Sequence, residues 1–358
     1  MIVPDLLAFE SFEAAALQRF AEHYRSIAAY GAYCDAKQRT PASVRTLSDV
    51  PLMPVTAFKT AVLQTQQAAA APVCVFETSG TTDGRPGTVR LSDPAHYDAA
   101  LHATFEYFVL PDAPGPMRCI SLVPTTSTRP CSSLGHMVQA LATRYGDGQG
   151  GCFIGPAAAQ HGAVDVDGLH GALQTASSDG TSTLILTTTI ALDMAARQWP
   201  HGTSLRLPPG SRLMDTGGPK GSATPIDRQA LLRRISALWG LESALCVGEL
   251  GMTELGSQRY ETTARAHLVG DVAPSRTYAG PPWLRSVVLD PLTMREVPEG
   301  VVGIVGHLDL ANVQTCAFIL TSDLGRIVNV NGAGATLELW GRVPGSQLRG
   351  CGLDAESL

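Results

Sequence analysis

The stretch VFETSGTTDGRPGTVRLSD, residues 75–93, holds six Ser or Thr and three Gly within fifteen residues, directly after an apolar run. Glycines let a backbone turn its N–H groups towards one point, and hydroxyl groups add further hydrogen-bond donors. A loop of this kind between a strand and a helix indicates a site for an anion such as phosphate. The stretch does not match the Walker pattern G-x-x-x-x-G-K-[ST], and it lacks the lysine that phosphate loops usually carry.

The composition is that of a soluble globular protein with a large core. The chain has 358 residues, of which 44% are hydrophobic and 16% charged, and its net charge is −6. This charge argues against broad contact with nucleic acid or acidic membranes. No apolar run is long enough to cross a bilayer and the N-terminus is not signal-like, so we expect no membrane insertion and a cytoplasmic location. Eight cysteines without a C-x-x-C pair are expected to be reduced and mostly buried.

Apolar periodicity predicts an α/β fold with layered sheets. Strand-like runs such as PVCVFE, RCISLVP, STLILTT, SRLMDT and SALCVGE alternate with helical patterns. Helices are predicted over 10–38, 94–108, 132–145 and 225–240, and a linker over 64–72. After about residue 270 the pattern is strand-like, which predicts a β-rich C-terminal part. The expected domain scheme is a helical lead (1–71), an α/β body (72–270), a β-rich subdomain (271–340) and a short tail (341–358).

Four short motifs, in order along the chain, resemble those of the adenylate-forming acyl-ligase superfamily. TSGTTDGRPG at 78–87 is similar to its phosphate loop, GMTE at 251–254 to its G-x-T-E motif, TSDLG at 321–325 to its T-G-D segment and GR at 341–342 to its hinge. The closer resemblance is to the acyl-protein synthetase branch, the LuxE-type family, over nearly the whole chain. It is carried by PLMPVTAFK, SSLGHM, GGPKG, GMTELGSQRY and GRVPGSQLRGC, at 51–59, 132–137, 217–221, 251–260 and 341–351.

The resemblance implies activation of a carboxylic acid, fatty or otherwise apolar, with ATP and Mg²⁺ to an acyl-adenylate. It also implies transfer to a cysteine and then to an acyl-accepting partner protein, a reductase or a carrier protein. The implied nucleotide-binding residues are Thr78, Ser79, Gly80, Thr81, Thr82, Gly84, Arg85, Gly217, Gly218, Gly251, Met252, Thr253, Asp323 and Arg342. Glu254 would ligate Mg²⁺, for which a carboxylate oxygen is a suitable hard ligand. His136, on a helix of the kind that lines the acyl pocket in this superfamily, would be a catalytic residue that acts as a shuttle or gate beside the carboxylate.

Each assignment has a plainer alternative. Glu254 could be a surface carboxylate after a turn, and Asp323 a turn-forming residue in a short S-D-L-G turn after a strand. Gly217 and Gly218 could form only a tight turn. His136 could be a structural helix residue.

The missing loop lysine leaves the source of positive charge open. The candidates are Arg85, Arg90 and Lys220. Lys59 is a further cation, for which we mainly expect a structural or surface role. Superfamily members carry a mobile C-terminal domain with a catalytic lysine, and we expect this chain to lack that domain because it ends sixteen residues after Arg342. Lys220 is therefore a candidate catalytic residue.

Cys351 is the candidate acyl acceptor, because it lies between two glycines and close to Arg349. Flanking glycines give access, and a nearby cation favours the nucleophilic thiolate. Two alternatives stay open. One is an acid:CoA or acid:carrier-protein ligase resembling phenylacetate-type ligases, in which Cys351 is incidental. The other is a non-catalytic nucleotide-binding scaffold subunit, which the absent lysine favours.

Overall fold

A computed structural model describes residues 11–78, 86–155, 164–217, 226–330 and 334–342. The chain divides into two units, each assembled from separate stretches of sequence. The first unit comprises Met1–Thr104, Gly251–Arg259 and Ala279–Leu358, and the second Phe105–Leu250 and Tyr260–Tyr278. The boundaries fall within α5 (Ala95–Phe108), β9 (Arg259–Glu261) and β10 (Tyr278–Ala279). The linear domain scheme expected from the sequence stays a prediction.

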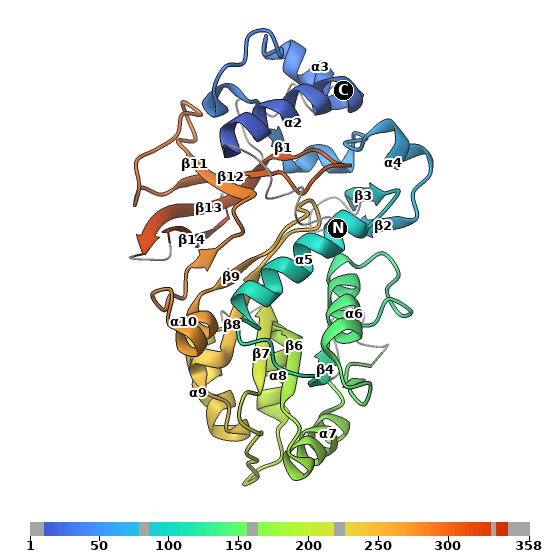
Figure 1. The fold of residues 1–358 in the computed structure, drawn as a ribbon, viewed down its shortest axis with the longest axis vertical. Helices are drawn as coiled ribbons and strands as arrows, with labels where there is room; N and C mark the ends of the chain where they lie inside the picture. The colour runs from blue at the N-terminus through green and yellow to red at the C-terminus, as the bar shows by residue number, and fades with distance from the viewer. Residues whose placement is uncertain (1–10, 79–85, 156–163, 218–225, 331–333, 343–358) are drawn as a thin grey trace. The chain divides into compact units, whose positions relative to one another are not determined.

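A parallel sheet forms the centre of the second unit (Figure 1). Its strands lie in the order β8, β7, β6, β4 and β5. Their bounds are β4 Arg118–Leu122, β5 Gly151–Cys152, β6 Thr183–Thr188, β7 Arg212–Thr216 and β8 Cys246–Leu250. The longer strands are nearly continuous apolar runs because a parallel sheet is covered on both faces.

Helices α7, α8 and α9 pack on one face of this sheet and share one apolar core with it. The helices of the unit are α6 Ser133–Tyr145, α7 Val166–Asp179, α8 Thr189–Gln198, α9 Arg228–Trp239 and α10 Thr263–Val269, with η4 at Ser243–Leu245. Asp165 and Asp227 cap α7 and α9 by accepting hydrogen bonds from Gly168 N and Ala230 N. Trp239, at the end of α9, is fully buried in this core and meets Trp199 edge to face.

Four antiparallel strands form the main sheet of the first unit, in the order β11, β12, β13 and β14. A short strand, β1, pairs with β13, and β2 pairs with β3 in a separate hairpin. The bounds are β1 Met53–Pro54, β2 Cys74–Glu77, β3 Thr88–Leu91, β11 Leu284–Leu289, β12 Gly303–Asp309, β13 Phe318–Val330 and β14 Gly334–Arg342.

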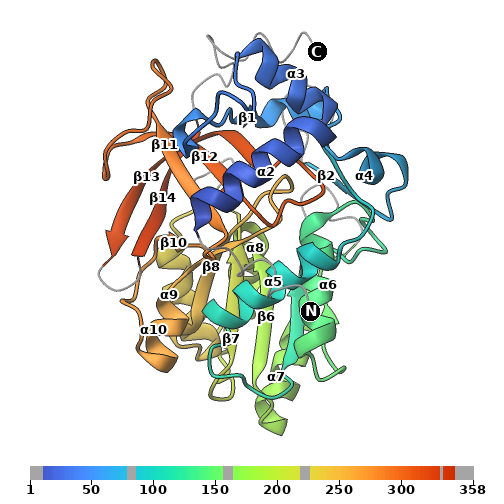
Figure 2. The ribbon, with the colours of Figure 1, turned by 45° about the horizontal axis from the view of Figure 1, so that its top comes forward.

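The N-terminal helices of the first unit pack on the start of β13 (Figure 2). The ring of Phe318 stacks on Tyr30 and meets Phe20 edge to face, and His23 Nδ1 accepts a hydrogen bond from Ala317 N. The helices of the unit are α2 Phe12–Ser26, α3 Ala28–Ala36, η1 Leu47–Asp49, η2 Val55–Lys59 and α4 Gln66–Ala70, together with most of α5.

The structure confirms the predicted α/β fold with a β-rich C-terminal part, and it places strands within all the quoted apolar runs. The predicted linker at 64–72 is wrong in part, because Gln66–Ala70 form α4 with Thr65 as N-cap. Four cysteines are buried, whereas Cys152 is exposed. No helix among the described residues combines the length and apolarity needed to cross a bilayer.

Replacing Trp239 with alanine tests the core of the second unit. Because the ring is fully buried, Trp239→Ala should lower the free energy of unfolding by about 3–5 kcal/mol. Trp340→Ala is the matched control and should cost less than about 1 kcal/mol, since Trp340 is 58% exposed. Denaturant titration of both variants measures the difference, and equal losses would contradict the assigned core.

Candidate nucleotide and acyl-activation site

The two ends of the predicted phosphate loop are joined at its base. Strands β2 and β3 pair up to Glu77 and Thr88, and Thr78 N then donates to Gly87 O over 2.9 Å. Gly87 N donates in turn to Thr78 Oγ1 over 2.8 Å. These bonds extend the pairing of β2 and β3 to Thr78 and Gly87. The remaining predicted loop residues, Ser79, Gly80, Thr81, Thr82, Gly84 and Arg85, lie outside the described residues.

The GMTE segment forms a turn whose last residue is buried. Leu255 N donates to Met252 O, and Glu254 O accepts a hydrogen bond from Asn312 Nδ2 over 2.8 Å. Asn312 also binds Cys316 O, so its amide connects the turn to the chain before β13. Glu254 is only 7% exposed, which excludes the plainer interpretation of an exposed surface carboxylate. Gly251 is exposed, and Thr253 is half-buried.

Asp323 lies inside the long strand β13, so the expected turn after the strand is wrong. Pairing with β14 carries the strand through the S-D-L-G sequence, and Asp323 is opposite Arg342. Arg342 Nε approaches Asp323 Oδ1 to 3.3 Å, while Asp323 N donates to Thr321 Oγ1. The structure therefore brings together two predicted site residues, an almost buried carboxylate and a half-exposed guanidinium.

In the second unit, Gly217 follows β7 with a φ of +83°, a conformation that favours glycine. Its carbonyl oxygen and Asp215 Oδ2 both lie within hydrogen-bond distance of Thr189 Oγ1, the latter at 2.8 Å, and they share its single proton. These contacts fix the start of the GGPKG segment at the carboxyl end of the parallel sheet, where ligands bind in open α/β folds. Gly218 and Lys220 lie outside the described residues.

Buried charges hold this end of the sheet together. Arg228 contacts both oxygens of Asp215 at 2.6–3.1 Å and also binds Glu261 at 2.9 Å. Arg276 adds a second ion pair to Glu261 at 2.8 Å. Each carboxylate is thus compensated by a guanidinium in a buried setting, as stability requires.

Glu249 is a site candidate that the sequence analysis missed. It lies opposite Thr216 in the β7–β8 ladder, is 5% exposed and accepts a hydrogen bond from Thr216 Oγ1. Burial raises the pKa of Glu249 from 4.5 to about 7, and the nearby carboxylate of Asp215 acts in the same direction. An acidic residue within the otherwise apolar strand CVGEL was the signal available in the sequence.

The other predicted residues stay predictions. His136 is half-buried on α6, Arg90 is half-buried on β3 and Lys59 ends η2. Cys351 lies outside the described residues.

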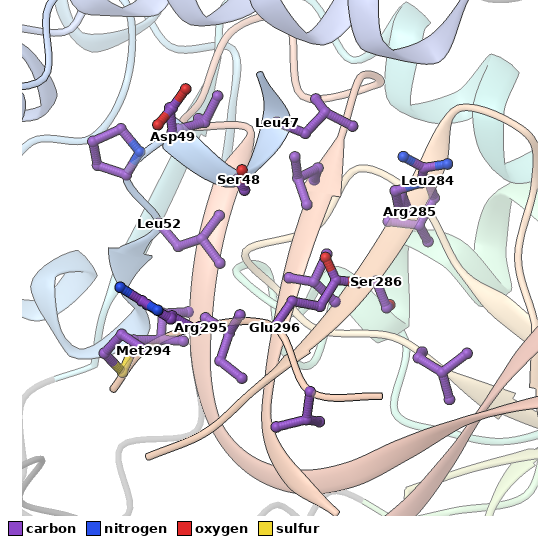
Figure 3. A pocket seen from close by; sticks show the side chains of 18 of the residues that line it. Leu47, Ser48, Asp49, Leu52, Leu284, Arg285, Ser286, Met294, Arg295 and Glu296 are labelled. Carbon is purple, nitrogen blue, oxygen red and sulfur yellow. The ribbon is translucent and has the colours of Figure 1, made fainter. Parts of the chain in front are cut away.

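A large groove in the first unit has a volume of about 1420 Å³ (Figure 3). It is lined by parts of 12–54, by Arg259, by much of 280–299 and by a few residues of β12–β14. None of the predicted nucleotide-binding residues that the structure describes lines this groove.

The protein is similar in sequence to two curated ligases over a limited segment, and no family model matches it. It is 33% identical over 75 residues to the long-chain-fatty-acid–luciferin-component ligase of Vibrio harveyi, and 31% over 82 residues to that of Aliivibrio fischeri. The matches span 20% and 22% of this chain and the same shares of those proteins.

Solved structures share the fold across most of the chain. A 2-hydroxyisobutyryl-CoA ligase in complex with R3-HIB-AMP matches 92% of this chain and 67% of its own, with 16% identity and a TM-score of 0.62. ATP-bound MatB from Rhodopseudomonas palustris matches 75% of this chain and 47% of its own chain, with 19% identity and a TM-score of 0.51. The resemblance inferred from the motifs is therefore confirmed in fold and, over the matched segments, in sequence.

Glu249→Gln should change how stability depends on pH. Below pH 4.5 the carboxyl is protonated in both the folded and the unfolded chain, so it contributes no pH dependence. Between pH 4.5 and about 7 the unfolded chain releases the proton while the folded chain keeps it, and stability falls. The wild type should lose about 3 kcal/mol more than the variant over this range.

Thermal unfolding of both proteins from pH 4.5 to 8 measures the effect. Glu242→Gln, at an exposed acid of the same unit, is the control and should follow the wild type. Parallel curves for the wild type and Glu249→Gln would contradict the raised pKa.

Proposed function

We propose that the protein uses ATP to activate a carboxylic acid as an acyl-adenylate. The observation that carries the proposal is Glu254, buried in the GMTE turn of a chain with the fold of acyl-CoA ligases. The local identity to two fatty-acid ligases supports the same reaction class and favours a fatty or other apolar acid. The order of the four motifs along the chain agrees with it.

In the proposed reaction a carboxylate oxygen of the acid attacks the α-phosphorus of ATP. The bond between the α-phosphorus and the bridging oxygen breaks, and pyrophosphate leaves with the electron pair. Two anions must approach each other, so fixed positive charge and amide donors have to stabilise the transition state. The phosphate loop that starts at Thr78 would supply donors, and Arg85, Arg90 or Lys220 the positive charge.

Glu254 suits Mg²⁺, because this ion is usually held by one or two carboxylates together with substrate phosphates. Within the described ranges no group of three or more His, Cys, Asp or Glu could hold a metal ion by itself. When bound, Mg²⁺ would neutralise phosphate charge. Glu254 would hold it at the end of a turn that Asn312 fixes.

Asp323 would bind the ribose hydroxyls of ATP. A carboxylate accepts two hydroxyl hydrogen bonds, and the neighbouring Arg342 orients it at 3.3 Å. Because both side chains project from paired strands, their positions are set by the ladder between β13 and β14.

For the second step we propose Cys351 as the acceptor. Its thiolate would attack the acyl carbon of the adenylate, a thioester would form and AMP would leave. The acyl group would then pass to a partner protein. Arg349, two residues earlier, would favour the thiolate.

A second candidate is transfer to coenzyme A or a carrier protein, without a protein thioester. It is favoured by the fold match to a CoA ligase over 92% of the chain. Mass spectrometry of the products separates the candidates, since the first yields an acylated protein and the second yields free acyl-CoA or acylated carrier.

Glu254→Gln should reduce acid-dependent exchange between ATP and pyrophosphate by about 100-fold or more, because the charge that holds the metal is lost. The assay should use a panel of short, long and aromatic acids so that the preferred substrate is included. Glu338→Gln, at a partly exposed carboxylate paired with Arg326, is the control and should retain exchange. Full exchange in Glu254→Gln would contradict the metal-binding role, and no exchange with any acid in the wild type would contradict the function.

Cys351→Ser should retain acid-dependent exchange and lose covalent acylation. Serine keeps the size of the side chain but is a much weaker nucleophile than a thiolate at neutral pH. Radiolabelled acid and hydroxylamine treatment detect the thioester on the protein. Hydroxylamine-labile label in the variant would show that another residue is the acceptor.

A further inference from the structure

The outer edge of β11 has backbone groups that no strand within the described residues uses. Asp309 N bonds to Ala317 O on the β13 side, so the neighbouring residues of β12 bond to β11. In an antiparallel ladder the bonding residues alternate, so Leu284, Ser286 and Val288 of β11 direct their backbone groups outwards. Val288 O is occupied by Val297 N, and Leu284 N by Pro281 O. The N–H and C=O of Ser286, between them, face the groove.

The groove extends to both faces of this edge strand (Figure 3). On one face, Ser286 is near Arg259, whose Nη2 donates to Ser286 Oγ over 2.7 Å. On the other face, Val287 packs with Leu52 and Met294 against a small apolar cluster. A chain lying along the edge would place successive side chains on alternate faces, next to a cation on one and an apolar wall on the other.

Arg259 is a buried cation that lines the groove. It is 4% exposed, and no described Asp or Glu lies within ion-pair distance of it. Both of its hydrogen bonds to described residues come from Nη2, to Ser286 Oγ and Leu284 O, while Nε has no partner there. Burial lowers the pKa of Arg259 to about 10, so the group is still charged at neutral pH. The carboxylate of Asp309 raises this pKa, but from beyond ion-pair distance, so the buried charge is only partly compensated. A partly compensated buried charge is still costly, and an incoming carboxylate would offset that cost.

The rest of the groove is also rich in cations. Lys37, Arg39, Arg285 and Arg295 line it together with Arg259, against Asp49, Glu296 and Glu299. Asp49 is paired with Arg39, and Glu299 accepts hydrogen bonds from Asn329. The lining therefore has an excess of positive charge, which favours an acidic ligand.

We propose that the edge of β11 binds an extended acidic segment of a partner polypeptide by strand addition. The residue opposite Ser286 would exchange two backbone hydrogen bonds with it and present an Asp or Glu side chain to Arg259. The residues on either side would place apolar side chains against Val287, Leu52 and Met294. The main-chain hydrogen bonds would provide affinity, and the side-chain contacts on the two faces of the strand would provide specificity. The inference does not rest on the proposed acid activation.

A selection from a phage library of random nonapeptides on the full-length protein tests this inference. Enriched peptides should alternate acidic and apolar residues, and their binding should weaken with added salt. With a fluorescein-labelled enriched peptide, Arg259→Gln should weaken binding at least about tenfold by polarisation. Arg25→Gln is the matched control, since Arg25 is exposed on α2 and does not line the groove.

Met294→Glu is a second variant in case Arg259→Gln does not fold, which thermal unfolding monitors. Met294 is only half-buried, so folding should be retained, while the new charge should repel the peptide and weaken binding by a similar factor. The proposal is overturned if no peptide is enriched, or if enriched peptides bind both variants like the wild type. It is also overturned if sedimentation shows a dimer that either variant dissociates, because the groove would then hold a second copy.

Discussion

The contact of Arg228 with Asp215 and Glu261 is the interaction on which the second unit depends. Asp215 lies on β7 and Glu261 on β9, and both are almost fully buried. A guanidinium can bind two carboxylates at once because its donors form a planar fork. Without it, Asp215 would be a buried carboxylate with no guanidinium partner, and Glu261 would keep only its ion pair with Arg276. With it, Asp215 stays in place to bind Thr189, which in turn contacts the carbonyl of Gly217. Gly248 can also pack closely against the ion pair of Arg228 and Glu261.

In the first unit, strand pairing holds the predicted site residues in place. Asn312 ties the backbone of Glu254 to the segment before β13, and β13 carries Asp323 to Arg342. Catalytic residues near the ends of regular elements are held more precisely than residues on free loops. The GMTE turn is therefore anchored to the sheet through Asn312, and the TSDLG segment through its pairing with β14.

Most of the fold could be predicted from the sequence, because its strands are apolar runs and its longer helices have a clear period. The predictions that were wrong show where a local sequence pattern is not enough to predict the structure. The S-D-L-G sequence contains turn residues, yet pairing with β14 keeps Asp323 in a strand, so tertiary context overrides propensity. Helix α8 follows β6 without a break, and its N-cap Thr188 is also the last strand residue, which hides the boundary. Glu249 was missed because the pKa of an acid in a strand depends on burial, which no local motif encodes.

An open edge strand is a hazard, since unpaired backbone groups can recruit other chains, and proteins usually cover or shorten such edges. Here the protection is partial, because residues 295–297 bond to the end of β11, whereas no backbone group of the described residues bonds to Ser286 on this edge. The cations around it also disfavour pairing with another basic edge, including the same edge of a second copy. In the proposed interaction, a short edge that the described residues leave open beside a buried arginine would discriminate among chains by charge. The same charge would oppose pairing between basic edges and favour one acidic strand.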